Sequence, residues 1–174
     1  MERIYNLQEE GMFDFLKKKQ KKQAEVMNLK AITDGKAISI EEVPDEIFSS
    51  KAMGDGVAFE SSTAVIVAPC DCKVEAMSPD MNHAIGLKLY NGMEILIHIG
   101  IDTVKLEGEG FKQIAKEGMN VKEGDVLLEF DKELIRKNNL CDNVLMIITE
   151  QGNVKNYRIN LGEVQKGNSI VVEW

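Results

Sequence analysis

Several residue types are scarce in this chain. Its 174 residues include only 2 histidines, 3 cysteines, 3 prolines and 1 tryptophan. Aromatic residues make up 6% of the chain against 44% hydrophobic residues in all, so the core must be built mainly from aliphatic side chains. The cysteines, Cys70, Cys72 and Cys141, are too few and too uneven in number for a disulfide framework, and they fit a reducing cytoplasm. The length suits a single domain.

The chain also lacks long apolar stretches and an excess of basic residues. No segment has the length and hydropathy of a membrane span, and no signal-peptide pattern is present. Asp and Glu outnumber Lys and Arg by 29 to 21, which gives a formal net charge of −8. Nucleic-acid binding needs a basic face and is therefore not expected. An acidic surface instead favours a basic protein partner.

The beginning of the chain differs from the rest. Apolar residues between Met12 and Leu16 are followed by a run of lysines, Lys17, Lys18, Lys19, Lys21 and Lys22. This pattern is compatible with a short amphipathic helix on an anionic membrane surface, and equally with a solvated basic tail. We assign residues 1–29 to a flexible N-terminal tail and residues 30–174 to one domain. Met12 is an alternative start of the protein.

From about residue 30 the pattern is one of short strands separated by glycine turns, which predicts an antiparallel β-sandwich or barrel-like fold. Two short helices are expected: residues 110–118, ended by Gly118, and residues 131–139, begun by Asp131. The segment 120–130 ("NVKEGDVLLEF") resembles the segment 163–174 ("EVQKGNSIVVEW"). Two similar turns would explain this likeness, as would a duplicated β unit.

Both histidines lie in one stretch, "HAIGLKLYNGMEILIHIG", residues 83–100. Asn91-Gly92 is a strong signal for a two-residue hairpin loop. In that register His83 and His98 are diagonal neighbours on one face, roughly 7–8 Å apart or less. No Lys or Arg falls on that predicted face. The argument depends on the register, because a slip by one residue moves side chains to the opposite face.

Two imidazoles on an apolar patch suit a small set of chemistries. An unprotonated imidazole is a good acceptor of a phosphoryl group, and apolar surroundings favour the neutral form. The second imidazole can then donate a hydrogen bond to the phosphoryl oxygens. The pair could also bind zinc, although it supplies only two of the usual three or four protein ligands. Two partly buried histidines with a purely structural role remain an alternative.

Longer motifs around the histidines identify a family. The runs "NHAI" and "ILIHIGIDTVKLEGEGF", residues 82–85 and 95–111, resemble the active-site signature of glucose-type enzyme IIA. That protein is a phosphocarrier of the bacterial phosphoenolpyruvate-dependent sugar phosphotransferase system. The resemblance extends in order over roughly residues 30–172, through "EEVPDEIF", "MGDGVAF", "VAP" and "EGMNVKEGDVLLEFD".

The resemblance implies a compact antiparallel β-sandwich built around a duplicated motif, and it implies roles for particular residues. His98 matches the histidine that carries the phosphoryl group on Nε2, and His83 matches the histidine that contacts this group. The Gly100 carbonyl would hold Nδ1 of His98. Asp102 and Asp45 match acidic residues at the rim of the active site. The apolar part of that rim would be formed by Phe48, Leu96 and Val104.

The same resemblance implies partners and a location. The donor would be the phosphocarrier protein HPr, an arginine of which meets Asp102 and Asp45. The acceptor would be a cysteine of an enzyme IIB domain in a sugar permease. No cofactor is required, although some members bind zinc through the two histidines and a partner's carboxylate. The tail resembles a membrane-touching segment of some members, so a cytoplasmic protein that can lie at the inner membrane surface is expected.

Two departures and two alternatives accompany this assignment. Met81 stands where many members have a threonine that orients the second histidine, and Cys72 stands where the family usually has glycine. A zinc hydrolase on a related scaffold would use His83 and His98 with a carboxylate, or with the C-x-C pair Cys70 and Cys72, as further ligands. A purely regulatory binding domain would dock the same apolar face on transporters or kinases. The sequence does not say which sugar is served.

Overall fold

The computed structural model describes residues 28–77 and 82–174. Residues 1–27 of the predicted N-terminal tail therefore lie outside the described residues. Met81 lies outside them as well. The first strand begins at Asn28, two residues before the predicted domain boundary. None of the described helices has the length and hydropathy needed to cross a membrane.

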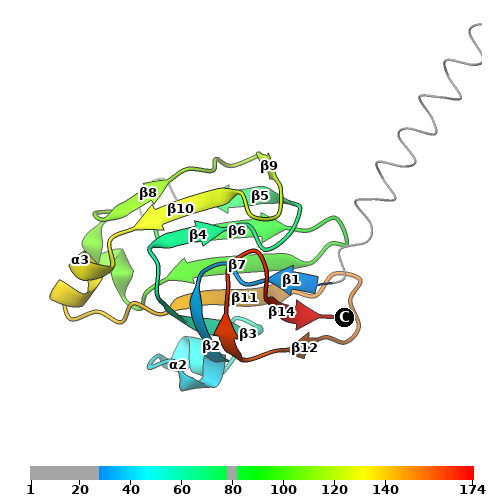
Figure 1. Cartoon of the computed structure of the whole chain (residues 1–174), viewed down its shortest axis with the longest axis horizontal. Helices are drawn as coiled ribbons and strands as arrows, with labels where there is room; N and C mark the ends of the chain where they lie inside the picture. Colours follow the sequence, from blue (N-terminus) through cyan, green and yellow to red (C-terminus); the bar gives the residue numbers. More distant parts are fainter. Residues whose placement is uncertain (1–27, 78–81) are drawn as a thin grey trace, which may run out of the picture.

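The described residues form fourteen strands and a few short helical segments (Figure 1). The strands are β1 (Asn28–Lys30), β2 (Gly35–Ser39), β3 (Asp55–Ser61), β4 (Val65–Val67), β5 (Cys72–Met77), β6 (Ala84–Lys88), β7 (Glu94–Ile99), β8 (Phe111–Gln113), β9 (Asn120–Val121), β10 (Val126–Phe130), β11 (Val144–Glu150), β12 (Arg158–Ile159), β13 (Gly162–Val164) and β14 (Ile170–Glu173). The helical segments are η1 (Ile40–Glu42), α2 (Glu46–Ser49), η2 (Thr103–Leu106) and α3 (Lys132–Lys137).

These strands form one large sheet and two small ones. The large sheet has eight strands in the order β13-β2-β3-β11-β7-β6-β5-β9. The small sheets have three strands each, in the orders β1-β14-β12 and β4-β10-β8. Every strand pairing is antiparallel. The predicted antiparallel β-sandwich is confirmed, and the described sheets do not close into a barrel.

The sheet order confirms the duplicated motif. The contiguous strands β4 to β10 build one half of the large sheet and one small sheet, and the remaining strands build the other half and the other small sheet. β9 and β13 form the two edges of the large sheet, while β10 and β14, which follow them, are the central strands of the two small sheets. The repeated sequence segments are therefore two copies of the same crossing from the large sheet to a small one. β7 and β11, the innermost strands of the two halves, pair at the middle of the molecule.

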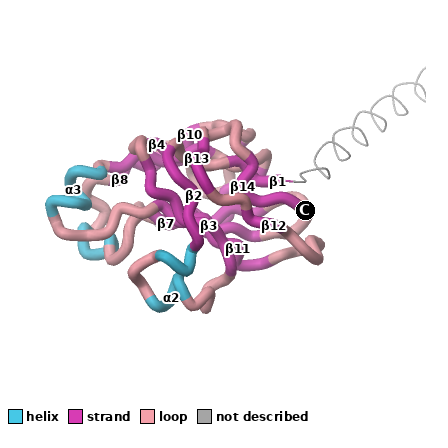
Figure 2. Tube along the Cα trace, turned by 60° about the horizontal axis from the view of Figure 1, so that its bottom comes forward, coloured by secondary structure: helices cyan, strands magenta, loops and turns pink. Residues whose placement is uncertain are grey.

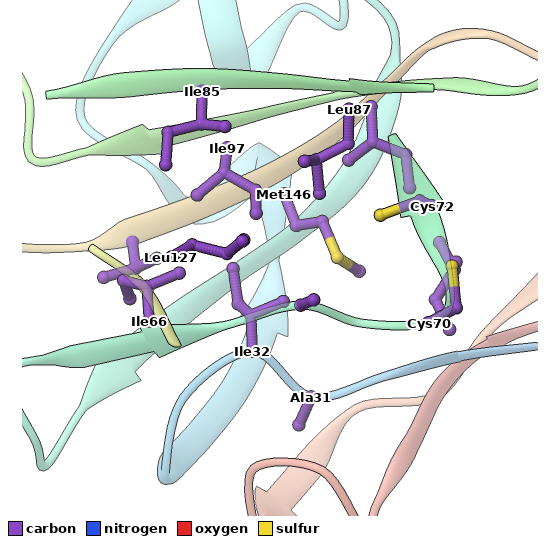
Figure 3. Packing of buried hydrophobic residues seen from close by; sticks show 14 of the residues in the cluster. Ala31, Ile32, Ile66, Cys70, Cys72, Ile85, Leu87, Ile97, Leu127 and Met146 are labelled. Atoms are coloured by element: carbon purple, nitrogen blue, oxygen red, sulfur yellow. The ribbon is translucent and has the colours of Figure 1, made fainter. Parts of the chain in front are cut away.

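The main core fills the space between the large sheet and the small sheets. Ile85 and Ile97 of the large sheet point toward Ile66 and Leu127 of a small sheet (Figure 3). All four side chains are fully buried. Burying a side chain of this kind stabilises the fold by about 1.5–3 kcal/mol, so this aliphatic cluster supplies much of the driving force for folding.

A second, smaller core lies on the opposite face of the large sheet. It contains Ile38, Ile40, Val43, Phe48, Ala58, Ile101, Leu145 and Ile147. The segment with η1 and α2 supplies three of these residues and covers this face (Figure 2). Asp45 caps the start of α2, and its carboxylate accepts hydrogen bonds from the amides of Ile47 (2.9 Å) and Phe48 (3.2 Å). This cap, which satisfies two free amides of the first turn, fixes where Phe48 enters the core.

One of the two predicted helices is present and the other is not. Asp131 caps α3 through a 2.9 Å bond from the amide of Leu134, as predicted. The prediction of a helix over residues 110–118 is wrong, because residues 111–113 form strand β8. The amides of Ile114 and Ala115 continue this path by donating to the carbonyl of Leu127 at 2.9 Å and 3.0 Å. Pairing with a distant strand has outweighed the local helical pattern, as often happens.

Candidate functional site

The hairpin that carries the histidines has a different register from the predicted one. Leu89 pairs with Met93 through a 2.9 Å backbone bond, so the loop has three residues, Tyr90, Asn91 and Gly92, and not two. Gly92 is in the left-handed region, with φ +87°, as a three-residue loop of this type requires. The Asn91 side chain also accepts from the amide of Met93 at 3.0 Å. The loop thus selects the register one residue away from the predicted one.

This slip changes which side chains share a face. Ile85 and Leu87 face the main core together with the row of isoleucines of β7, and are not beside His98 as predicted. On the other face His98 lies opposite Ala84, and Leu96 lies opposite Gly86. Ala84 and Gly86 have small side chains and are themselves half-buried. Leu96 is half-buried there and packs against the second core.

The two imidazoles nevertheless come together. The ring centroids of His83 and His98 are 4.8 Å apart, with the rings edge to face. His83 lies just before β6, after Asn82 with φ +44°, so the alternation of side chains along the strand does not extend to it. Its carbonyl accepts from the amide of Ile99 at 2.8 Å. The pair is therefore produced by a bend in the chain before β6, and not by diagonal neighbours in a regular ladder.

Two phenylalanines enclose the histidine pair. Phe48 of α2 lies 5.1 Å from the ring of His98, and Phe111 of β8 lies 6.1 Å from the ring of His83. Phe48 was predicted in the rim, whereas the contact of Phe111 was missed. The matching motif ends on Phe111, and that was the one signal in the sequence that could have pointed to it. His83 is 5% exposed and His98 is half-buried, so His98 presents the more accessible ring.

One hydrogen bond determines which nitrogen of His98 is reactive. Nδ1 of His98 lies 2.9 Å from the carbonyl oxygen of Gly100. A carbonyl oxygen only accepts, so Nδ1 carries the proton in this pair and Nε2 of a neutral ring keeps its lone pair. The structure agrees here with the role that the resemblance implies for Gly100. Nε2 of His98 is thereby the ring nitrogen whose lone pair is available.

The surroundings of His98 also keep this ring neutral. Burial, in the first place, and the neighbouring His83 lower the pKa of His98 from its ordinary value of 6.5 to about 4. The bond to the Gly100 carbonyl and the charge of Asp45 act in the opposite direction and recover only part of the shift. At neutral pH the imidazole is therefore unprotonated, which is the state a nucleophile requires.

The depressed pKa makes a prediction about pH. We expect the neutral form of His98 to persist from pH 8 down to about pH 5.5, where an ordinary imidazole is roughly 90% protonated. An NMR titration of the ring nitrogens measures this directly, and a midpoint near 6.5 would contradict it.

The unfolded chain binds this proton at a higher pH than the folded chain. Stability should therefore fall as the pH drops from about 6.5 toward 4, the two values between which the pKa shifts.

The two predicted acidic rim residues have different settings. Asp45 is the half-buried cap of α2 and its charge acts on His98. Asp102 is exposed at the turn after Gly100 and forms a 2.7 Å ion pair with Lys105. A partner's arginine would have to compete with Lys105 for this carboxylate, at a small cost because exposed ion pairs contribute about 0–1 kcal/mol. Val104, also predicted in the rim, is 47% exposed.

The prediction that the face carries no Lys or Arg needs correction. In the observed register Lys88 lies on the same side as Ala84, the residue opposite His98. It is four residues further along β6, about 13 Å away at strand spacing, and forms a 2.8 Å ion pair with Glu94. Lys88 therefore does not neutralise charge at His98.

The arrangement does not by itself complete a metal site. The described part of the chain holds no group of three or more His, Cys, Asp and Glu side chains suited to a metal ion. His83 and His98 could supply two ligands to zinc, which usually has four. Cys70 and Cys72 are buried in the main core, at 2% and 0% exposed (Figure 3). That position fits the simpler interpretation of the C-x-C pair as small core residues at a strand end.

The fold and this site together define a β-sandwich protein with a neutral, half-buried histidine whose Nε2 is available as a nucleophile. The chain belongs to the EIIA 1 family of the phosphoenolpyruvate-dependent sugar phosphotransferase system, whose model matches residues 27–154. A solved structure, glucose permease IIA from Mycoplasma capricolum, is similar at 32% sequence identity and a TM-score of 0.75. The match covers 84% of this chain and 94% of that one. The protein is thus a phosphotransferase component of sugar transport, as the sequence motifs predicted.

Proposed function

We propose that His98 accepts a phosphoryl group on Nε2 from the phosphohistidine of the phosphocarrier protein HPr. It then passes the group to a cysteine of an enzyme IIB domain in a sugar permease. The observation that carries this proposal is the 2.9 Å contact between Nδ1 of His98 and the Gly100 carbonyl, which leaves Nε2 unprotonated. His83 lies with its ring edge to face with that of His98, which supports a contact of His83 with the phosphoryl oxygens.

Both transfers can be written with balanced bonds. In the first, the Nε2 lone pair of His98 forms the new P–N bond while the P–N bond of the donor breaks and returns its electron pair to the donor imidazole. In the second, a cysteine thiolate forms a P–S bond and the pair returns to Nε2. Each step needs positioning and charge stabilisation more than covalent chemistry from the protein.

The charges around the site suit a cationic partner. The charge of Asp45 acts on His98, where the incoming phosphoryl group is also negative. Asp102, at the turn after Gly100, adds a second carboxylate, whose charge Lys105 partly offsets. The positive charge for the transfer must then come largely from the partner, through an arginine that meets both carboxylates. The net charge of −8 favours the encounter with such a basic surface.

The first test is intact mass after incubation with phosphoenolpyruvate, enzyme I and HPr. We expect one added phosphoryl group that is lost in mild acid, as a phosphohistidine is. No addition with active helper proteins would reject the carrier function. The alternatives would then be a binding-only role of the same face, or a zinc site that His83 and His98 complete with a carboxylate from a partner.

His83→Gln should separate acceptance from delivery. The amide of glutamine can still donate a hydrogen bond to a phosphoryl oxygen, but it cannot become a cation that offsets the phosphoryl charge. We expect acceptance from HPr within about ten-fold of the wild-type rate, because the partner's arginine supports that step. Delivery to the enzyme IIB cysteine should slow by about 10²-fold or more, the factor typical of removing one group that stabilises charge in the transition state.

Single-turnover rates for the two steps measure this separation, with wild-type protein and His98→Ala as the two limits. Equal losses in both steps would show that His83 only supports the ring of His98. Rates like those of the wild type in both steps would exclude a role for His83 altogether.

Two further parts of the proposal concern location. We propose that the protein acts in the cytoplasm and that the lysine-rich segment after Met12 contacts the inner membrane surface. This segment lies outside the described residues. Binding of the full chain to anionic vesicles, compared with a chain that begins at Asn28 and so keeps all of β1, tests this contact.

A further inference from the structure

The turn that follows His98 is held by bonds from three sides. The amide of Gly100 donates to the carbonyl of Asn143 at 2.8 Å, and the amide of Ile101 donates to the carbonyl of Cys141 at 2.9 Å. The hydroxyl of Thr103 reaches back to the carbonyl of Ile99 at 2.6 Å. The two peptide units around Gly100 are therefore fixed, and its carbonyl is directed at Nδ1 of His98.

Thr103 is unusual among the residues of this turn because it is polar and completely buried. Its exposed fraction is 0%, although it lies next to the exposed Asp102 and Val104. Its methyl group packs against the α-carbon of Gly100, since a Cβ built at Gly100 would lie only 2.3 Å from Thr103 Cγ2. The side chain thus closes the turn twice, through its hydroxyl to Ile99 and through its methyl group to Gly100.

We propose that Thr103 is a positioning residue for the phosphoryl transfer. This proposal rests on the proposed function of His98. By holding the carbonyl of Ile99 and packing on Gly100, it orients the Gly100 carbonyl toward Nδ1 of His98. That orientation keeps the proton on Nδ1 and the lone pair on Nε2. Loss of the hydroxyl lets the turn relax, so the opposite tautomer, with the proton on the reactive Nε2, becomes populated.

The chain contains a matched control for this residue. Thr33 is also 0% exposed, and its hydroxyl lies 2.7 Å from that of Ser61. It lies on the turn between β1 and β2 and has no part in the bonds around Gly100. Thr33→Val and Thr103→Val remove the same group from equally buried positions. A difference in tautomer or rate between the two variants therefore comes from the place of Thr103 beside Gly100. It does not come from the general cost of losing a buried hydroxyl.

The experiment compares Thr103→Val, Thr103→Ser and Thr33→Val with the wild type. Long-range proton–nitrogen NMR gives the tautomer of each imidazole, and the two histidines of the chain make the spectrum simple to assign. We expect Thr103→Val to show a mixture of tautomers at His98 and to accept the phosphoryl group about five-fold more slowly, the factor of one ordinary hydrogen bond. Thr103→Ser, which keeps the hydroxyl, should recover the wild-type tautomer, and Thr33→Val should keep both the tautomer and the rate.

An unchanged tautomer and rate in Thr103→Val, equal to those of Thr33→Val, would overturn the proposal. If Thr103→Val does not fold, Thr103→Ala removes the hydroxyl and the methyl group together, and Thr33→Ala becomes its matched control. The tautomer can be measured without any partner. A wild-type protein that accepts no phosphoryl group would therefore reject the proposed function, while the spectra still decide whether Thr103 orients the ring.

Discussion

His98→Ala is expected to abolish phosphoryl acceptance. The neighbouring His83 is 5% exposed, so it should not replace the lost nucleophile. His98 is half-buried and bonds to the Gly100 carbonyl, which gives it both access and a free Nε2. Removing the nucleophile removes the only covalent step available, so we expect the rate to fall to background, at least about 10⁴-fold. Intact mass after incubation with phosphoenolpyruvate, enzyme I and HPr measures it.

The control for this experiment is His83→Gln, which keeps His98 and should still take up one phosphoryl group. Thermal unfolding of both variants checks that the sandwich is intact. If the His98→Ala protein still gained an acid-labile phosphoryl group, the assignment of the acceptor would be wrong, and His83 would become the first candidate.

Gly100→Ala, which adds one methyl group, should lower both the stability of the fold and the rate of phosphoryl acceptance. Gly100 has φ +73°, and its added Cβ would lie 2.3 Å from Thr103 Cγ2 and 2.8 Å from the carbonyl oxygen of Cys141. The first atom is the end of a side chain and can move, but the second is backbone. Strain and crowding together should cost roughly 3 kcal/mol of unfolding free energy. The carbonyl of residue 100 would also turn away from Nδ1 of His98, so acceptance should fall by at least about ten-fold.

Gly118→Ala provides the matched control for this substitution. Gly118 has a similar φ of +84°, but nothing lies within 4 Å of an added Cβ. This variant should lose only the conformational part, about 1 kcal/mol, and should transfer phosphoryl groups normally. Equal losses of stability in chemical denaturation of the two variants would show that the contacts around Gly100 do not constrain the turn.

The sequence alone settled the fold class and the family. Alternating isoleucines in β7 define a buried row because side chains alternate along any strand, whatever its neighbours. The carboxylate of Asp131 begins α3 because capping is local, involving an amide only three residues away. The motif from Ile95 to Phe111 matched the family without any knowledge of the tertiary structure.

Features that depend on contacts between residues far apart in the chain could not be predicted from the sequence alone. The segment 110–118 has a helical pattern, but β10 draws residues 111–113 into a sheet. The Asn91-Gly92 signal located the hairpin correctly, while the choice between a two- and a three-residue loop depended on which residues the core would bury. The contact of Phe111 with His83 joins a strand of a small sheet to the segment that leads into the large sheet, and it has no local signature.

The histidine pair shows both contributions in one place. Its two members, and the glycine that follows His98, were evident from the sequence, because the residue types and motif spacing are local properties. The ring nitrogen of His98 that keeps its lone pair was decided by the tertiary structure, because the turn around Gly100 is fixed by carbonyls of Asn143 and Cys141, about forty residues further along the chain. The neutral state of the ring was decided there as well, since desolvation depends on everything packed around it.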